Sequence, residues 1–536
     1  METFDVIVSG YGPTGQAFAS LLSRLGHRVC VIERWPSLYG LPRLCTIDGE
    51  SARIVQAAGN IDEALRDSHQ LRRTLLLNED EQLILKMDHD RITTSGYPSH
   101  ISMYQPHIED AMDAAAREHG ATVYQGWEVQ SWTQSEDGVT VEARQTGSND
   151  PADTMTLQAK YLIGADGARS AVREAAGIAR EGSDFRSAWI CVDAVRKRTL
   201  PKFWGLSEDM RESVIMAAPE GRAFAVIPIG DRRLRFEFYA DPASAHDERM
   251  GFDAGYEVLE RVHGLTRDDV EIYRTVLFPF ESRLARTWRK GRVLLAGDAA
   301  HTMTPFLAQG ACSGLRDAVN LSWKLDLVLR GASDPSLLDM YFVERFPQVS
   351  EVVAVSEQIG AWAMELDPVK ARKRDKDLLD GAVLPPPPPA ADIDEGILFK
   401  HDIEPAVGQL APQGRVSFGG REGKFDDVFG WGFQLIVRDA DVSRSFSDED
   451  RAFLEAINCS VVGVGDVERN GVAVDVDGSY AAYFDEHRIV GILARPDFYV
   501  FGVMHEIEDA AVVVGELRRQ LSGSHEQAVH EAAHAG

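Results

Sequence analysis

The first apolar segment of the chain leads directly into a glycine-rich turn and then into a helical pattern. Residues 4–9 (FDVIVS) form a continuous run of apolar and β-branched residues, which is typical of a buried strand. Residues 16–25 continue with small and apolar side chains, and residues 28–32 form a second apolar strand ending at Glu33. Strand, turn, helix and strand in this order predict an α/β unit with a parallel sheet.

In the middle of the chain, apolar and polar residues alternate along short segments. Short alternating strands such as SAWICVDAVRK, RAFAVIPIG and RRLRFEFYA, with a polar helical stretch at about residues 253–262, predict an antiparallel sheet over residues 181–281. This region also contains Arg222, Arg233, Arg235 and Tyr239. Alternation places Arg233, Arg235 and Glu237 on one strand face, the usual arrangement of a solvated face.

A third apolar strand, residues 293–296, ends at Gly297 and Asp298. Small residues, Pro305 and a turn at Gly310 follow, and apolar residues then recur at helical spacing over residues 315–329. Residues 341–347 begin another helix.

The last third of the chain is set apart by the uninterrupted proline run 385–389, which predicts a semi-rigid spacer. Apolar strands at residues 432–438, 459–463 and 497–503 alternate with helical stretches beyond it and predict a small α/β domain. We therefore divide the chain into an α/β unit in two parts (1–180 and 282–365), a β-sheet domain (181–281), a linker (366–395), a C-terminal domain (396–522) and a disordered tail (523–536).

Composition narrows the functional classes. The formal charge of −28 argues against binding nucleic acid or an anionic membrane through bulk electrostatics. Five widely spaced cysteines form no C-x-x-C pair and predict reduced, buried thiols, and we expect no metal site. No segment holds 18 uninterrupted apolar residues, and no signal sequence precedes the first strand, so we expect a cytoplasmic protein that does not span a membrane.

The glycine-rich turn Gly10-Tyr11-Gly12-Pro13-Thr14-Gly15 matches G-x-G-x-x-G between a strand and a helix. Gly10 permits the tight turn, Gly12 lets a pyrophosphate approach the backbone, and Gly15 lets helix and strand pack closely. Glu33 follows 23 residues after Gly10, as expected of a carboxylate that bonds the ribose of an adenosine. These residues predict a dinucleotide site without separating FAD from NAD.

Two further carboxylates terminate apolar strands. Asp166 lies in YLIGADGARS and Asp298 in RVLLAGDAAH. Asp298 can reach the ribityl hydroxyls of an extended FAD. Asp166 either contacts the pyrophosphate region, braces an approaching nicotinamide, or forms an ordinary Asx turn.

Together, GYGPTG, GADGARS and AGDAAHTMTPFLAQG resemble the motifs of the FAD-dependent aromatic hydroxylases, the group A flavoprotein monooxygenases. The likeness covers nearly the whole chain and is greatest for the 3-(3-hydroxyphenyl)propionate hydroxylase and phenol hydroxylase branch. It implies that the two-part α/β unit is a Rossmann-type FAD-binding domain, called the cofactor domain below, and that the C-terminal domain is a thioredoxin-like α/β domain. It also implies that the antiparallel sheet is a substrate domain like that of para-hydroxybenzoate hydroxylase. In that domain, the candidates for contact with a substrate carboxylate are Arg222, Arg233, Arg235 and Tyr239. Cys459 has no partner for thiol chemistry, so we expect the C-terminal domain to serve packing or subunit contact in a homodimer.

The resemblance also implies which residues contact the cofactor. Arg34 would lie beside the ADP half, and Val129 at the adenine. Arg43 and Gln105 would lie at the pyrophosphate and flavin side, or else be a solvated arginine and a helix cap. Pro305 and Gln309-Gly310 would border the isoalloxazine, although Leu307-Ala308 stands where the family often has Ala-Gly. The full set is Gly10, Gly12, Pro13, Thr14, Gly15, Glu33, Arg34, Arg43, Gln105, Val129, Asp166, Asp298, Pro305, Gln309 and Gly310.

The activity implied is hydroxylation of a small phenolic substrate, ortho to an existing hydroxyl, with NADH or NADPH and O2 as co-substrates. The resemblance implies that hydride would reduce the flavin, that oxygen would add to give a flavin hydroperoxide, and that the ring would attack its distal oxygen. The base that deprotonates the phenol is not identified by the sequence; Tyr239, His100 and His301 are weak candidates, each of which a packing or capping role also explains.

Three alternatives remain open. The same scaffold could serve a tailoring hydroxylase of a polyketide or antibiotic. It could also serve a flavin-dependent reductase that inserts no oxygen, or a non-catalytic protein that only binds FAD or NAD.

Overall fold

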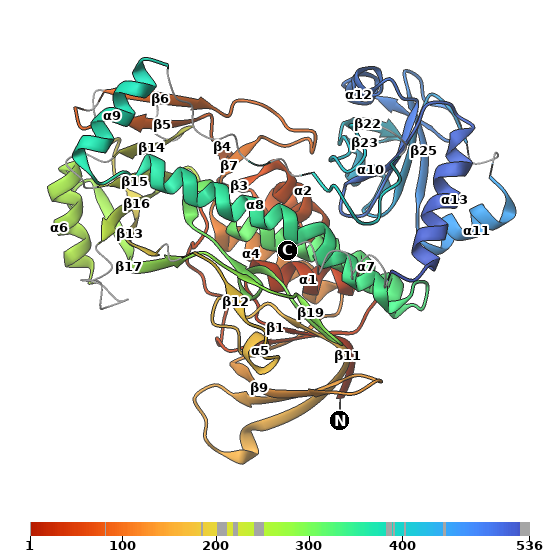
Figure 1. Cartoon of the computed structure of the whole chain (residues 1–536), viewed down its shortest axis with the longest axis horizontal. Helices are drawn as coiled ribbons and strands as arrows, with labels where there is room; N and C mark the ends of the chain where they lie inside the picture. Colours follow the sequence, from red (N-terminus) through yellow and green to blue (C-terminus); the bar gives the residue numbers. More distant parts are fainter. Residues whose placement is uncertain are drawn as a thin grey trace.

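The computed structural model describes residues 2–80, 82–183, 186–200, 212–217, 223–240, 251–381, 389, 392–400, 404–442 and 446–525. Three sheet-based units lie around two long central helices, with the C-terminal domain to one side of them (Figure 1). Arg222, residues 385–388 of the proline run and residues 526–536 of the expected tail lie outside the described residues. No helix among the described residues is long and apolar enough to cross a membrane.

The first unit is an eight-stranded sheet in which β20, β11, β1, β2 and β8 run parallel. Its apolar strands lie in the largest buried core of the molecule, as their continuous hydrophobic runs predict. The strands are β19 (Arg289–Lys290), β20 (Val293–Leu295), β11 (Thr154–Gly164), β1 (Glu2–Ser9), β2 (Val29–Glu33), β8 (Thr122–Gln125), β10 (Val139–Gln145) and β9 (Trp127–Gln134).

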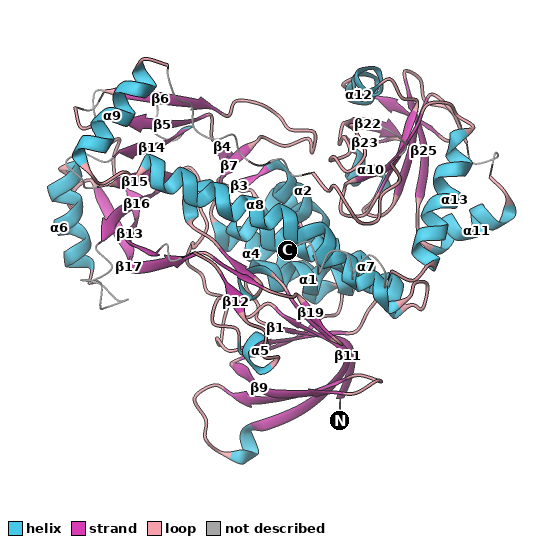
Figure 2. Ribbon diagram, in the orientation of Figure 1, coloured by secondary structure: helices cyan, strands magenta, loops and turns pink. Residues whose placement is uncertain are grey.

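Helices cover this sheet and extend across the centre of the molecule (Figure 2). The helix α7 is buried along almost its whole length, which explains why its apolar residues are not confined to one face. The helices are α1 (Pro13–Arg24), α2 (Gly49–Ala58), α3 (Ile61–Ala64), α4 (Gln105–Glu118), α5 (Ala171–Ala175), α7 (Gly310–Leu329) and α8 (Met340–Ala363).

The second unit is a seven-stranded sheet that is antiparallel except where β14 pairs with β5. Its strands β5 and β6 come from the range 1–180, and the other five lie in the range 181–281 in which we predicted the antiparallel sheet. Its strands are β17 (Val270–Glu281), β13 (Arg186–Arg196), β16 (Arg233–Ala240), β15 (Phe224–Ile229), β14 (Ser213–Ala217), β5 (Arg73–Leu77) and β6 (Leu83–Asp88). The helices α6 (Phe252–His263) and α9 (Pro368–Leu379) lie beside it (Figure 1).

The prediction of a solvated face on β16 is wrong for two residues. Arg235 and Glu237 are buried. The Arg235 guanidinium pairs with Asp193 and donates hydrogen bonds to the carbonyls of Pro42 and Arg43. Alternation identifies two strand faces, but it does not reveal that a distant loop covers one of them.

The C-terminal unit has a parallel β24–β25–β26 arrangement extended by the antiparallel β27 and β28, as expected of a thioredoxin-like domain. Its elements are β22 (Arg415–Phe418), β23 (Arg421–Lys424), α10 (Phe425–Phe429), β24 (Gln434–Arg438), α11 (Asp448–Ala456), β25 (Ser460–Gly465), β26 (Val472–Asp475), α12 (Ser479–His487), β27 (Gly491–Ala494), β28 (Val500–Met504) and α13 (Asp509–Ser522). Burial raises the pKa of the Cys459 thiol to about 12, which disfavours a reactive thiolate.

Two small sheets and four short turns complete the described elements. One sheet is β3 (Thr46–Asp48), β7 (His100–Ser102) and β4 (His69–Gln70), and the other is β12 (Arg180–Glu181), β18 (Arg283–Ala285) and β21 (His301–Thr302). The 3-10 turns are η1 (Pro151–Asp153), η4 (Gly297–Ala299), η5 (Pro305–Leu307) and η6 (Pro335–Asp339).

Candidate active site

The glycine motif brings the ends of β1 and β11 together. A Cβ at Gly10 would lie 2.3 Å from the carbonyl oxygen of Ala165, and one at Gly15 would lie 2.1 Å from the carbonyl oxygen of Gly10. Both positions therefore need glycine for close packing. A Cβ at Gly12 would meet nothing within 4 Å, so the backbone there faces open space at the start of α1.

Glu33 lies at the end of β2 and holds this turn in place. Its Oε2 accepts a hydrogen bond from the Tyr11 N–H at 2.7 Å, and its Oε1 accepts one from the Trp35 N–H at 2.9 Å. The neighbouring Arg34 is exposed and lies over the Trp35 ring. The carboxylate therefore fixes the backbone on both sides of the nucleotide turn.

Asp298 occupies the turn η4 after β20. It is exposed, whereas the other residues from 293 to 300 are buried. It makes no hydrogen bond or ion pair with the residues that the structure describes. Desolvation raises the pKa of Asp298, while His301, Arg43 and Arg180 lower it.

Thr14 joins the first and third motifs. A Cβ at Gly297 would lie 2.8 Å from Thr14 Oγ1, and a Cβ at Gly314 would lie 2.2 Å from the same atom. The start of α1, the Asp298 turn and the first part of α7 therefore pack against one another at a point that only glycines allow.

Asp166 directs one carboxylate oxygen back to its own loop. Oδ2 accepts a hydrogen bond from the Val172 N–H at 3.1 Å, whereas Oδ1 is buried and has no partner among the described residues. The Arg173 guanidinium donates to the carbonyls of Ala168 and Ala299, and so links this loop to the Asp298 turn. Sequence reasoning missed Arg173.

Gln105, the first residue of α4, positions the loop that carries Arg43. Its Oε1 accepts hydrogen bonds from the N–H groups of Arg43 and Leu44, both at 2.7 Å. Its Nε2 donates to Glu109 Oε1 at 2.9 Å, and burial raises the pKa of Glu109 to about 7. The Arg43 side chain is exposed.

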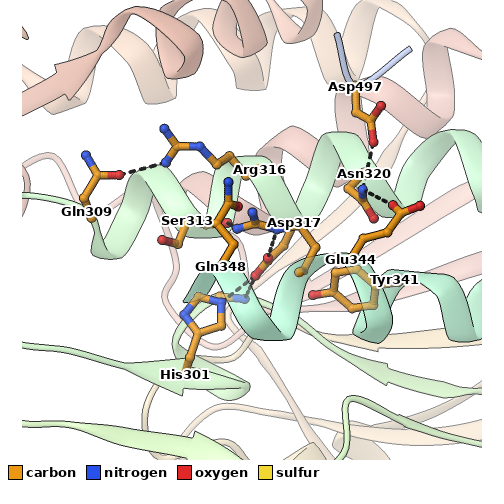
Figure 3. Close-up of polar contacts among 12 residues, drawn as sticks. His301, Gln309, Ser313, Arg316, Asp317, Asn320, Tyr341, Glu344, Gln348 and Asp497 are labelled. Atoms are coloured by element: carbon orange, nitrogen blue, oxygen red, sulfur yellow. Dashed lines mark hydrogen bonds and ion pairs between the residues drawn. The ribbon is translucent and has the colours of Figure 1, made fainter. Parts of the chain in front are cut away.

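The first turn of α7 is fixed by a network of buried charges. Arg316 donates to Gln309 Oε1 at 2.8 Å and to Asp48 Oδ2 at 2.6 Å, and Gln309 Nε2 also donates to Asp48 Oδ2 (Figure 3 shows Arg316 and Gln309). Burial opposes ionisation, but Arg316 and hydrogen bonds lower the pKa of Asp48 to about 2. The turn before it contains Pro305 and Ala308, and Ala308 has a left-handed backbone with φ of 55°.

His301 and His100 both have packed environments. The His301 side chain is fully buried, and its Nε2 lies 2.6 Å from Asp317 Oδ2 (Figure 3). Asp317 also accepts hydrogen bonds from the Gly297 N–H and from Arg345. These contacts support a structural role for His301. The rings of His100 and His89 are tilted against each other with centroids 4.0 Å apart, and burial lowers the pKa of His100.

Tyr239 lies in a different environment, among aromatic side chains between β16 and the η5 turn. The Trp189 ring makes edge contacts with the rings of Tyr239 and Phe306, each with centroids 6.0 Å apart. We call Trp189, Tyr239, Phe278, Phe280, Phe306 and Trp362 the aromatic cluster; all except Trp189 are only partly buried. Val129, by contrast, is buried in β9 within the core of the cofactor domain.

Comparison with known proteins identifies the family. A model described as "FAD binding domain" matches residues 3–356, and one described as "HcaD C-terminal domain" matches residues 408–520. The protein named "Probable NADH-specific resorcinol 4-hydroxylase" from Rhodococcus jostii is 33% identical over 96% of this chain and 95% of its own length. The chain belongs to the FAD-dependent aromatic hydroxylases.

Other relatives agree with this assignment. A 3-(3-hydroxy-phenyl)propionate/3-hydroxycinnamic acid hydroxylase from Mycolicibacterium smegmatis is 30% identical over 97% of this hydroxylase and 93% of its own length. Aklavinone-11 hydroxylase, solved with FAD and aklavinone, has the same fold, with a TM-score of 0.77 at 24% identity over 97% of this chain and 99% of its own. The predicted fold class, FAD cofactor and monooxygenase activity are thus confirmed at the level of the family.

Proposed function

We propose that this hydroxylase introduces a hydroxyl group into a small phenolic ring, ortho to an existing hydroxyl, with NADH as the favoured reductant. The resorcinol hydroxylase from R. jostii is named as NADH-specific, which supports the choice of nucleotide and of a phenol as substrate. The aromatic cluster is the structural observation that carries the proposal.

The described residues fit the shape and chemistry of FAD at three points. Open space at Gly12 suits a pyrophosphate at the helix start, where backbone N–H groups favour an anion. The unbonded Asp298 carboxylate suits the ribityl hydroxyls, and the orphaned Oδ1 of Asp166 can accept one further hydrogen bond. We assign the cofactor contacts to the fifteen residues that the family resemblance implies; of these, Glu33 and Gln105 also bond backbone N–H groups of the site.

The position of the aromatic cluster indicates where the substrate ring binds. It connects the β13 and β16 face of the second sheet to Phe306 in the η5 turn, which borders the proposed flavin position. Partly exposed aromatic side chains bind a planar ring through apolar contact and edge-to-face packing. Among the three candidate bases, Tyr239 is the one that belongs to this cluster, so we propose that its hydroxyl contacts the phenol.

Bound FAD supplies hydride acceptance from the nicotinamide and the activation of O2, and the chain's residues provide the surroundings. The amino-terminal N–H groups of α7 carry partial positive charge and stabilise an anion beside Gly310. The second sheet and η5 exclude water from the reacting ring. Gln105 and Arg235 hold the loop that bears Arg43.

The test is a panel of resorcinol, phenol and 3-hydroxyphenylpropionate, assayed with NADH and with NADPH. Oxygen uptake, hydroxylated product and hydrogen peroxide are measured together. The proposal predicts that at least one phenol gives an ortho-hydroxylated product in amounts close to the oxygen consumed. NADH oxidation without oxygen uptake would instead identify a reductase, and oxygen uptake matched by peroxide for every phenol would contradict the proposed substrate class.

A further inference from the structure

One turn of the C-terminal domain reaches into the core of the cofactor domain. It joins β27 to β28 and comprises residues 495–499. Phe498 has a left-handed backbone, is buried, and belongs to the hydrophobic core formed mainly by the cofactor domain. The Arg53 guanidinium of α2 lies 4.2 Å from the centre of the Phe498 ring. This insertion brings the turn of the C-terminal domain against α2.

The next residue continues the link through hydrogen bonds. The Tyr499 hydroxyl donates to Glu50 Oε1 at 2.9 Å, and Arg316 Nε donates to Glu50 Oε2 at 2.5 Å. Arg316 in turn donates to Gln309 Oε1, at the residue that precedes α7. Tyr499, Glu50 and Arg316 are all buried. A continuous buried path therefore connects the C-terminal domain to Gln309.

The balance of charge explains why Tyr499 matters on this path. Two carboxylates, Asp48 and Glu50, share the guanidinium of Arg316. Glu50 Oε1 receives its hydrogen bond from Tyr499 rather than from a cation. Without that donor, a buried carboxylate oxygen beside Asp48 would lose its partner, and Arg316 would be drawn toward Glu50 and away from Gln309.

A second set of contacts in the same turn anchors the middle of α7. Asn320 donates to Asp497 and to Glu344 of α8, and the Arg495 guanidinium bonds both Glu344 and Asp497 (Figure 3 shows Asn320, Glu344 and Asp497). The turn 495–499 thus bonds α7 directly at Asn320 and reaches Arg316 of α7 through Glu50. These contacts restrict both the rotation of the helix and its position along its axis.

We propose that Tyr499 is a positioning residue for the cofactor site: the turn 495–499 of the C-terminal domain holds Gln309 and the start of α7 in the geometry that binds the flavin ring. The inference rests on the proposed placement of that ring beside Gln309 and Gly310. It gives the C-terminal domain a role in this enzyme that requires no thiol chemistry.

The test compares Tyr499→Phe with the matched control Tyr480→Phe in the full chain. Tyr480 is also a buried tyrosine of the C-terminal domain, but its hydroxyl donates to the carbonyl of Pro412. The dissociation constant of FAD is measured by flavin fluorescence, together with the visible spectrum of the bound flavin and the melting temperature of the apoprotein. We expect Tyr499→Phe to raise the dissociation constant about fivefold, equivalent to about 1 kcal/mol, and to shift the flavin spectrum.

The control should lower the melting temperature but keep the parental FAD affinity and spectrum. Equal effects of both variants on FAD binding, or no effect of Tyr499→Phe, would overturn the inference. Glu50→Gln tests the same path if Tyr499→Phe does not fold, and it should also weaken FAD binding and shift the spectrum.

Gln309→Ala separates this inference from the placement on which it rests. If Gln309→Ala alters the affinity and spectrum while Tyr499→Phe does not, the flavin placement stands and the role of Tyr499 fails. If Gln309→Ala alters neither, the placement fails, and the inference fails with it.

Discussion

Replacement of Ala308 by glycine should stabilise this hydroxylase. Ala308 closes the η5 turn with φ of 55° and ψ of 26°. The left-handed conformation costs an L-residue about 1–2 kcal/mol because its Cβ crowds the following carbonyl. Glycine avoids that cost but loses about 0.5–1 kcal/mol more conformational entropy on folding. We therefore expect Ala308→Gly to increase the stability of the cofactor domain by about 0.5–1 kcal/mol.

The assay is thermal unfolding of the FAD-loaded protein, followed by the release of flavin fluorescence. The expected rise in melting temperature is about 1–3 °C. Ala115→Gly is the matched control, because Ala115 is half-buried in the helix α4 and glycine lowers helix stability there by about 1 kcal/mol. The two alanine-to-glycine changes should thus shift the melting temperature in opposite directions. A fall for both variants would refute the reasoning and show that position 308 gains nothing from left-handed freedom.

Three other changes test the site. Glu109→Gln keeps an acceptor for Gln105 and should become more stable than the parent as the pH rises, by up to about 3 kcal/mol. The reason is that burial raises the pKa of Glu109 in the folded parent from 4.5 to about 7. The parent therefore has a contribution to stability that is complete below pH 4.5 and is lost as the pH rises through 7. Urea unfolding of both proteins from pH 5 to 8 measures the difference in stability, and a difference that does not change with pH would contradict the prediction. Asp298→Ala should weaken FAD binding at least about tenfold through loss of charged hydrogen bonds, measured by fluorescence titration, whereas parental affinity would exclude the ribityl contact. Asp317→Asn should destabilise the fold by about 3 kcal/mol because the charge of Arg345 is left buried without its partner, and a loss below about 1 kcal/mol in urea unfolding would show that the network compensates.

The sequence predicts those parts of the site whose geometry is set by neighbouring residues in the chain. Gly10, Gly12 and Gly15 were assigned different tasks from motif spacing, and the structure gives each a matching environment: close packing at the first and third, open space at the second. The Asp298 turn was also predictable, since a carboxylate after an apolar strand must lie at the sheet edge. Such features depend on backbone geometry within a few residues.

Other features depend on contacts that no local pattern encodes. Arg235 is buried because the loop at Pro42 and Arg43, almost 200 positions away, supplies its carbonyl acceptors. The pairing of Arg316 with Glu50 spans 266 positions. Periodicity predicts the helix over residues 315–329, but it does not identify the distant partners of the buried charges that this helix carries.

The charges of α7 suggest why this helix is the fixed centre of the molecule. Four polar residues of this helix are buried: Arg316, Asp317, Asn320 and Lys324. Arg316 bonds β3 and α2, and Asp317 bonds the Asp298 turn and α8. Asn320 and Lys324 both bond Glu344 of α8, and Asn320 also bonds Asp497 of the C-terminal domain. A purely apolar helix could slide or rotate with small changes in free energy, because apolar contacts are not directional. Buried charges allow no such freedom, since displacement leaves each without its partner. The helix α7 begins at Gly310. The contacts that hold the helix therefore also hold Gly310, beside which we expect the flavin ring to bind.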